Sequence, residues 1–127
     1  MKFEFDTNKG QILVVVKVSA YSIRGEVTLA LDTGADVTVI EEHFLREFGF
    51  DTRSGVDGIK LTTASGYGIA RKLVVPNFRA LGKTRRNFAL ACYTFPKSIG
   101  VDGVLGLDFF RGFDLNINFK TGQIHLK

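Results

Sequence analysis

Apolar and polar residues alternate along most of the chain, and this period of two predicts β-strands. The predicted strands lie within residues 11–20, 26–31, 59–81, 87–92 and 115–126. The first of these runs is rich in β-branched side chains, which fit a pleated, half-buried surface. The pattern therefore predicts a mainly β chain.

Turn residues divide these strands into hairpins. The run Ala64-Ser65-Gly66-Tyr67-Gly68 breaks the alternation of residues 59–81, and we expect it to be the tip of a long hairpin. Gly82 and Lys83 form a second turn, and residues 120–123 form a third between two short strands. Most strands are therefore expected to have a sequence neighbour as a partner.

One segment has the helical period instead. Thr38 and Glu41 have the spacing of a capping box, in which each side chain satisfies a free backbone N–H at a helix start. Gly49 is placed to end this helix. We also expect a short helix within residues 109–113. The apolar face of the first helix consists of Ile40, Phe44, Leu45 and Phe48.

The composition describes an ordinary folded chain. Its 127 residues are 45% hydrophobic and 24% charged, which predicts a single domain over residues 1–127 and excludes a disordered protein. No apolar run is long enough for a membrane span, and no signal peptide is evident. The single cysteine, Cys92, cannot form an internal disulfide, which favours a reducing compartment. We therefore expect a cytoplasmic protein without a membrane partner.

The net charge of +4 is compatible with an acidic partner but does not require one. Basic residues next to aromatic ones, as found near the second turn, can bind nucleic acid. A solvated hairpin tip explains the same cluster, and we favour it because the cluster is short. Nucleic acid is therefore not the expected partner. The cluster consists of Arg79, Lys83, Arg85 and Arg86, flanked by Phe78 and Phe88.

The sequence gives little support for a metal site or a reactive thiol. His43 and His125 are far apart in the sequence and have no cysteine or carboxylate at ligand spacing, so we expect neither a metal nor another cofactor. Cys92 lies on an apolar strand without a histidine in a recognisable motif. We expect it to be a buried, unreactive thiol.

The most informative residues are Asp32-Thr33-Gly34-Ala35. An aspartate directly after a buried strand is costly unless it is hydrogen-bonded or functional. Thr33 offers a hydroxyl group, and Gly34 allows close approach of the backbone, whose N–H can reach the carboxylate. A plain strand-to-helix turn would use the same residue types, so the tetrapeptide alone leaves both interpretations open.

A second element favours the functional interpretation. Val104-Leu105-Gly106 follows the tetrapeptide by about seventy residues and, like it, joins an apolar strand to a glycine and a helical segment. Together the two elements resemble those of the retropepsin-like aspartic proteases. The expected hairpin tip lies where that family has its flap, so the resemblance implies that Tyr67 and its neighbours bind substrate. The implied flap residues are Thr63, Ala64, Ser65, Gly66 and Tyr67. Tyr67 is equally well explained as a cross-strand packing residue.

The resemblance implies an all-β fold, a closed barrel with one or two short helices. It also implies an aspartic endopeptidase that cleaves an extended peptide or protein, with Asp32 as the catalytic carboxylate and Thr33, Gly34 and Ala35 supporting its loop. The mechanism needs two carboxylates that share a proton. Asp102 and Asp108 are not followed by Thr-Gly, and we expect structural roles for both. The second carboxylate should therefore come from a second copy of the chain.

The sequence departs from the viral members at one position. There an arginine commonly follows the second glycine element, whereas Leu107 follows it here, so Asp36 lacks its expected partner. Arg46 and Arg111 are the candidates to replace it. Two other classes of function stay open. One is a weakly active or inactive protease fold that serves as a dimerisation or peptide-binding module, and the other is a basic β-domain that binds nucleic acid.

Overall fold

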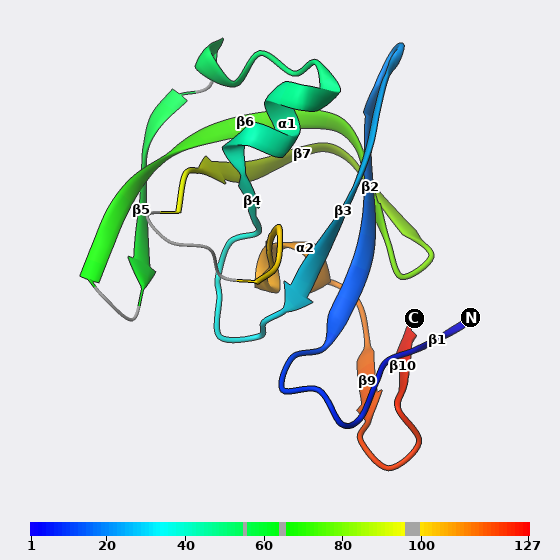
Figure 1. The fold of residues 1–127 in the computed structure, drawn as a ribbon. Coiled ribbons are helices and arrows are strands. Elements are labelled where there is room, and N and C mark those ends of the chain that lie inside the picture. The colour runs from blue at the N-terminus through cyan, green and yellow to red at the C-terminus, as the bar shows by residue number, and fades with distance from the viewer. Residues whose placement is uncertain (55, 64–65, 96–99) are drawn as a thin grey trace.

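The computed structural model describes residues 1–54, 56–63, 66–95 and 100–127, and it is mostly β-structure (Figure 1). Its strands are β1 (Lys2–Glu4), β2 (Leu13–Ala20), β3 (Ile23–Leu31), β4 (Val39–Glu41), β5 (Val56–Thr63), β6 (Gly66–Ala80), β7 (Lys83–Tyr93), β8 (Gly103–Leu105), β9 (Leu115–Asn118) and β10 (Gln123–Leu126). Its helices are α1 (Glu42–Phe48), the short 3₁₀ helix η1 (Thr52–Ser54) and α2 (Leu107–Phe110).

The main sheet closes on itself. Its strand order is β2-β3-β8-β4-β7-β6-β5, and an additional pairing of β2 with β6 joins six of the strands into a barrel. Among the described residues, strand β5 lies outside the ring and pairs only with β6. The predicted all-β closed barrel with short helices is confirmed.

The core follows the alternation seen in the sequence. Val16 on β2 is fully buried, whereas its neighbour Lys17 is exposed. Aromatic rings fill the barrel end near α2, where the centroid of Phe78 lies 4.6 Å from that of Phe88 and 5.5 Å from that of Phe109. Burying one such side chain contributes about 1.5–3 kcal/mol, so these rings hold α2 firmly against the barrel.

The first helix starts later than predicted. Its N-cap is Glu41, no side chain caps its N-terminus, and Gly49 ends it in the left-handed conformation as expected. The predicted capping box is wrong because Thr38 belongs to the preceding buried segment and bonds elsewhere. The second helix also lies two residues earlier than expected, at α2 rather than residues 109–113.

Strand β8 lies between β3 and β4, although both strands are far from it in the sequence. It runs parallel to β3, with Leu31 opposite Leu105, and antiparallel to β4, with Val39 opposite Val104. The turn that joins β3 to β4 therefore passes the end of β8. This brings the two predicted glycine elements side by side.

The chain ends form a second, small sheet with the order β1-β10-β9 (Figure 1). Phe3 pairs with Ile124, which in turn pairs with Ile117, so the apolar side chains share one face. Ile124 is 1% exposed, which shows that this face packs on the core. The N-terminal strand thus pairs with the C-terminal hairpin of its own chain.

The turn at Gly82 joins β6 to β7 as predicted, and the basic residues near it divide into two groups. Arg79 and Arg86 are exposed, which agrees with a solvated hairpin tip. Arg85 is different, because its guanidinium donates hydrogen bonds to the carbonyls of Phe109 and Arg111 at the end of α2. Across the described ranges, no helix is long and apolar enough to span a membrane.

Candidate active site

Asp32 follows directly on β3, at the start of the turn to β4. Its backbone N–H donates to the carbonyl of Leu105 at 3.0 Å, which fixes the turn to β8. Its Oδ1 accepts the backbone N–H of Gly34 at 2.9 Å, as the sequence analysis anticipated. Within the part of the chain that the structure describes, its Oδ2 accepts no hydrogen bond. Asp32 is half-buried, while Thr33 and Gly34 are exposed, so this carboxylate is accessible.

Gly106 holds the other side of the same turn. A Cβ atom at this position would lie 2.6 Å from the carbonyl oxygen of Val37 and 2.8 Å from that of Ala35, so only glycine fits. The next residue, Leu107, donates its N–H to the carbonyl of Ala35 at 2.8 Å. The two glycine elements are therefore in close contact.

The buried side chain of Thr38 links the Asp32 turn to the Gly106 element. Thr38 is fully buried, and its hydroxyl donates to Oδ1 of Asp108 at 2.6 Å, while its N–H donates to Oδ2 at 2.9 Å. The Thr38 hydroxyl also accepts the N–H of Gly106 at 3.1 Å. The Asp108 carboxylate thus connects Thr38, which follows the Asp32 turn, to the start of α2. The sequence analysis did not identify this link.

The other three aspartates named in the sequence analysis do not share the surroundings of Asp32. One carboxylate oxygen of Asp102 accepts the N–H of Thr28 at 2.8 Å and so ties the entry of β8 to β3. Asp108 is occupied by Thr38, and it also lies in the first turn of α2, as expected. Asp36 is exposed, and neither Arg46 nor Arg111 forms an ion pair with it among the described residues.

The predicted flap is the tip of the β5–β6 hairpin. The backbones of Thr63 and Gly66 pair directly, and Thr62 pairs with Tyr67, so the tip lies where the sequence placed it. Ala64 and Ser65 lie outside the described residues, and only the backbone is described at Thr63, Gly66 and Tyr67. The two explanations of Tyr67 therefore both remain predictions.

An apolar cluster connects the base of this hairpin with the Asp32 turn. Leu61 and Ala70 from the hairpin pack with the buried residues Val39 and Ala91. Partly buried side chains from both sides extend this cluster, namely Val37, Ile59, Tyr93, Phe95 and Val104. Because Val37 follows the Asp32 turn and Val104 lies on β8, this apolar cluster extends from the hairpin to the segments beside Asp32.

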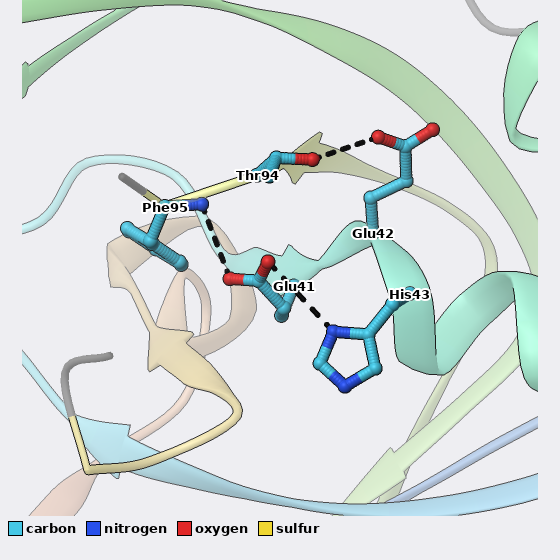
Figure 2. Close-up of polar contacts among 5 residues, drawn as sticks. All are labelled: Glu41, Glu42, His43, Thr94 and Phe95. Carbon is cyan, nitrogen blue, oxygen red and sulfur yellow. Dashed lines mark hydrogen bonds and ion pairs between the residues drawn. The ribbon is translucent and has the colours of Figure 1, made fainter. Parts of the chain in front are cut away.

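Two glutamates at the start of α1 bind the end of β7 (Figure 2). Oε2 of Glu41 accepts the N–H of Phe95 at 3.2 Å, and Oε2 of Glu42 accepts the hydroxyl of Thr94 at 2.9 Å. The pKa of Glu42 is lowered, chiefly by the hydroxyl of Thr94 and then by that of Thr52, which donates to Oε1 at 2.9 Å. The sequence analysis assigned Glu41 to a helix cap and missed this role.

The other candidate groups do not form a site. Cys92 is buried, as predicted, and burial, followed by the nearby Glu42 carboxylate, raises the pKa of its thiol to about 11. His43 lies 3.8 Å from the Glu41 carboxylate and is half exposed. Over the ranges that the structure covers, no three histidine, cysteine or acidic side chains are grouped to hold a metal ion.

The chain thus combines a closed six-stranded barrel with an Asp-Thr-Gly turn that lies against a second glycine element. The chain belongs to the aspartyl protease family, whose model matches residues 16–109. No curated protein matches the sequence. The retropepsin-like resemblance drawn from the motifs is confirmed, and the chain is an aspartic-type hydrolase by family.

Two solved structures show the same fold. A retropepsin-like aspartic protease from Rickettsia conorii superposes with a TM-score of 0.74 at 16% identity, covering 99% of this chain and 88% of the other. The protease of EIAV, complexed with the inhibitor HBY-793, superposes with a TM-score of 0.61, also at 16% identity. That match covers 86% of this chain and 92% of the viral one.

Proposed function

We propose that the chain is an aspartic endopeptidase that acts as a homodimer on extended peptide segments. Asp32 of each copy supplies one of the two catalytic carboxylates. The observation that carries this proposal is the Asp32 carboxylate itself, which is accessible and has one oxygen held by Gly34. The chain has one Asp-Thr-Gly turn, so a pair of such carboxylates requires a two-fold axis.

In the proposed reaction, a water molecule lies between the two Asp32 carboxyl groups. The ionised carboxylate takes a proton from this water while the oxygen attacks the peptide carbonyl carbon. The protonated carboxyl of the other copy gives its proton to the carbonyl oxygen, which yields a tetrahedral diol. The C–N bond then breaks as the nitrogen gains a proton, leaving a carboxylic acid and an amine. The rate should follow a bell-shaped pH profile, because one group must be protonated and the other ionised.

Strand β9 is the surface that we propose for pairing with the second copy. Asp114 and Lys127 exchange both backbone hydrogen bonds at 3.0 Å, so the alternate residues Leu115 and Ile117 turn their backbone groups away from β10. No charged residue lies on this Leu-Asn-Ile-Asn strand, although edge strands that avoid pairing usually carry charges. The opposite edge, β1, carries Lys2 and Glu4.

The position of β9 also favours this pairing. Leu107 is bonded to the carbonyl of Ala35 in the catalytic turn, and β9 begins eight residues after it (Leu115). In Figure 1, β9 follows below α2, whose first residue bonds to the catalytic turn. Pairing of two β9 strands would therefore place the dimer axis near Asp32.

The bound peptide would lie between the Asp32 turn and the hairpin. Its backbone can pair with the hairpin as an added strand, while its side chains enter the apolar lining around Val37 and Val104. We expect a preference for apolar residues next to the cleaved bond.

The test combines cleavage with assembly. Asp32→Asn should keep the fold and the dimer but abolish cleavage of a peptide library at acid pH. Ile117→Pro removes an N–H that points away from β10, so it should shift the dimer toward monomer and reduce activity at low concentration. Glu4→Pro is the matched control, because the N–H of Phe5 faces Gly122 and that of Glu4 therefore faces outward on the other edge.

The outcomes separate the alternatives. If Asp32→Asn cleaves at the wild-type rate, Asp32 is not the catalytic group. If Ile117→Pro and Glu4→Pro leave the dimer equally intact in sedimentation experiments, β9 is not the interface. Peptide binding without any cleavage by the wild-type dimer would instead identify a peptide-binding module.

A further inference from the structure

The connection between β7 and β8 is fixed at both of its ends by one residue, Glu41. The Glu41 carboxylate accepts the N–H of Phe95 at 3.2 Å, and the backbone N–H of Glu41 donates to the carbonyl of Asp102 at 2.8 Å. The Glu41 side chain is only 16% exposed, so this bond is formed in a largely dry environment. The neighbouring Glu42 adds the bond to Thr94 (Figure 2).

The segment held in this way carries two aromatic rings. Tyr93 and Phe95 meet edge to face, with centroids 5.1 Å apart, and both pack on the apolar cluster between the hairpin and the Asp32 turn. A Cβ atom at Gly68 would collide with the Tyr93 hydroxyl, which shows that this tyrosine lies against the backbone of β6. Both rings are only partly buried. They therefore present apolar surface beside the proposed peptide path.

We propose that Glu41 is a positioning residue that holds Tyr93 and Phe95 as an aromatic side wall for an apolar side chain of the substrate. The proposal rests on the proposed function, because it concerns the peptide that this site would bind. Without the carboxylate, the N–H of Phe95 loses its acceptor and the ring loses the constraint that keeps it on the wall. Glu41 contacts neither the peptide nor the reacting atoms, so it acts only through these rings.

A matched set of variants tests this role. Glu41→Ala removes the acceptor, whereas Glu41→Gln keeps an oxygen that can accept the Phe95 N–H in a neutral hydrogen bond and should lie between Glu41→Ala and wild type, nearer to wild type. Glu47→Ala is the control, since Glu47 is an exposed glutamate near the other end of α1. The substrates are one peptide with an apolar residue next to the cleaved bond, chosen by library digest, and its analogue with alanine at that position.

For Glu41→Ala we expect KM for the apolar peptide to rise about tenfold, the effect of losing one charge-assisted hydrogen bond. kcat should stay within about twofold, and the alanine analogue should be affected little, because its side chain does not reach the wall. If Glu41 only stabilised the fold, its replacement by alanine would change the kinetic constants for both peptides equally. Equal changes for both peptides, or none for either, would overturn the proposal.

A second measurement does not depend on catalysis. The chain has no tryptophan, so Phe95→Trp places a single tryptophan on the wall, whose emission can be excited selectively over that of the three tyrosines. In an Asp32→Asn background, adding Glu41→Ala should increase quenching by acrylamide and weaken binding of the apolar peptide about tenfold, with Glu41→Gln largely restoring both. Unchanged quenching and binding would refute the positioning role, even if the wild-type protein proved unable to cleave.

Discussion

The Thr38–Asp108 link predicts a large effect from a very small substitution. Thr38→Val keeps the shape of a fully buried side chain but removes its hydroxyl. Asp108 then loses the donor at 2.6 Å, and the N–H of Gly106 loses its acceptor at 3.1 Å. A hydrogen bond to a charged group contributes about 1.5–3 kcal/mol, and an unsatisfied buried donor costs about 1–3 kcal/mol. Together these give about 3–5 kcal/mol.

Such a loss is a large part of the stability of a small domain, which is about 5–15 kcal/mol. We expect the Tm of Thr38→Val to fall by about 10–20 °C, measured by calorimetry or circular dichroism. At temperatures where Thr38→Val is still folded, its rate of peptide cleavage should also be lower than that of wild type, because the same link positions the Asp32 turn. Thr84→Val is the control, since Thr84 is exposed and its hydroxyl bonds to Arg79 at the surface. A Tm within about 2 °C of wild type for both variants would refute the reasoning.

Three further predictions concern other contacts. Arg85→Lys should lower the free energy of unfolding by about 1–2 kcal/mol in urea titrations, because lysine cannot bond the Phe109 carbonyl twice and lie over the Phe113 ring. Cys92, with a pKa of about 11, should resist iodoacetamide at pH 8 in the native protein and react in urea, as followed by mass spectrometry. The lowered pKa of Glu42 stabilises the fold above the ordinary glutamate pKa, and this contribution disappears as the pH falls through the folded value. The difference in unfolding free energy between wild type and Glu42→Gln should therefore shrink below about pH 4; a difference that stays constant to pH 2 would contradict the assignment.

Local signals were sufficient for most of the fold and for the centre of the site. Alternation located most strands, Gly49 ended the first helix, and the residue types of Asp32-Thr33-Gly34 predicted the bond from the Gly34 N–H to the Asp32 carboxylate. These features depend on residues within a few positions of each other, where backbone conformation and hydrogen bonding follow directly from residue type.

The contacts that sequence reasoning missed join distant residues. Thr38 and Asp108 are 70 positions apart, and Glu41 and Phe95 are 54 positions apart. The capping-box prediction failed for the same reason, because the Thr38 and Glu41 side chains bond to these distant partners instead of to a helix start. The pairings of β4 with β7 and with β8 bring these partners together, and no local pattern encodes their registers.

The pairing of β1 with β10 also bears on how the molecule folds. Phe3 meets Ile124, so this ladder brings together nearly opposite ends of the sequence and closes the longest loop in the chain. Contacts of such separation form slowly, whereas β6–β7 and β9–β10 are hairpins that can form early. The barrel should thus close before β1 docks, and the docking of β1 becomes a late event in refolding. Until β1 docks, the edge of β10 opposite β9 would stay open, and a folding intermediate would expose a strand edge that can pair with other chains.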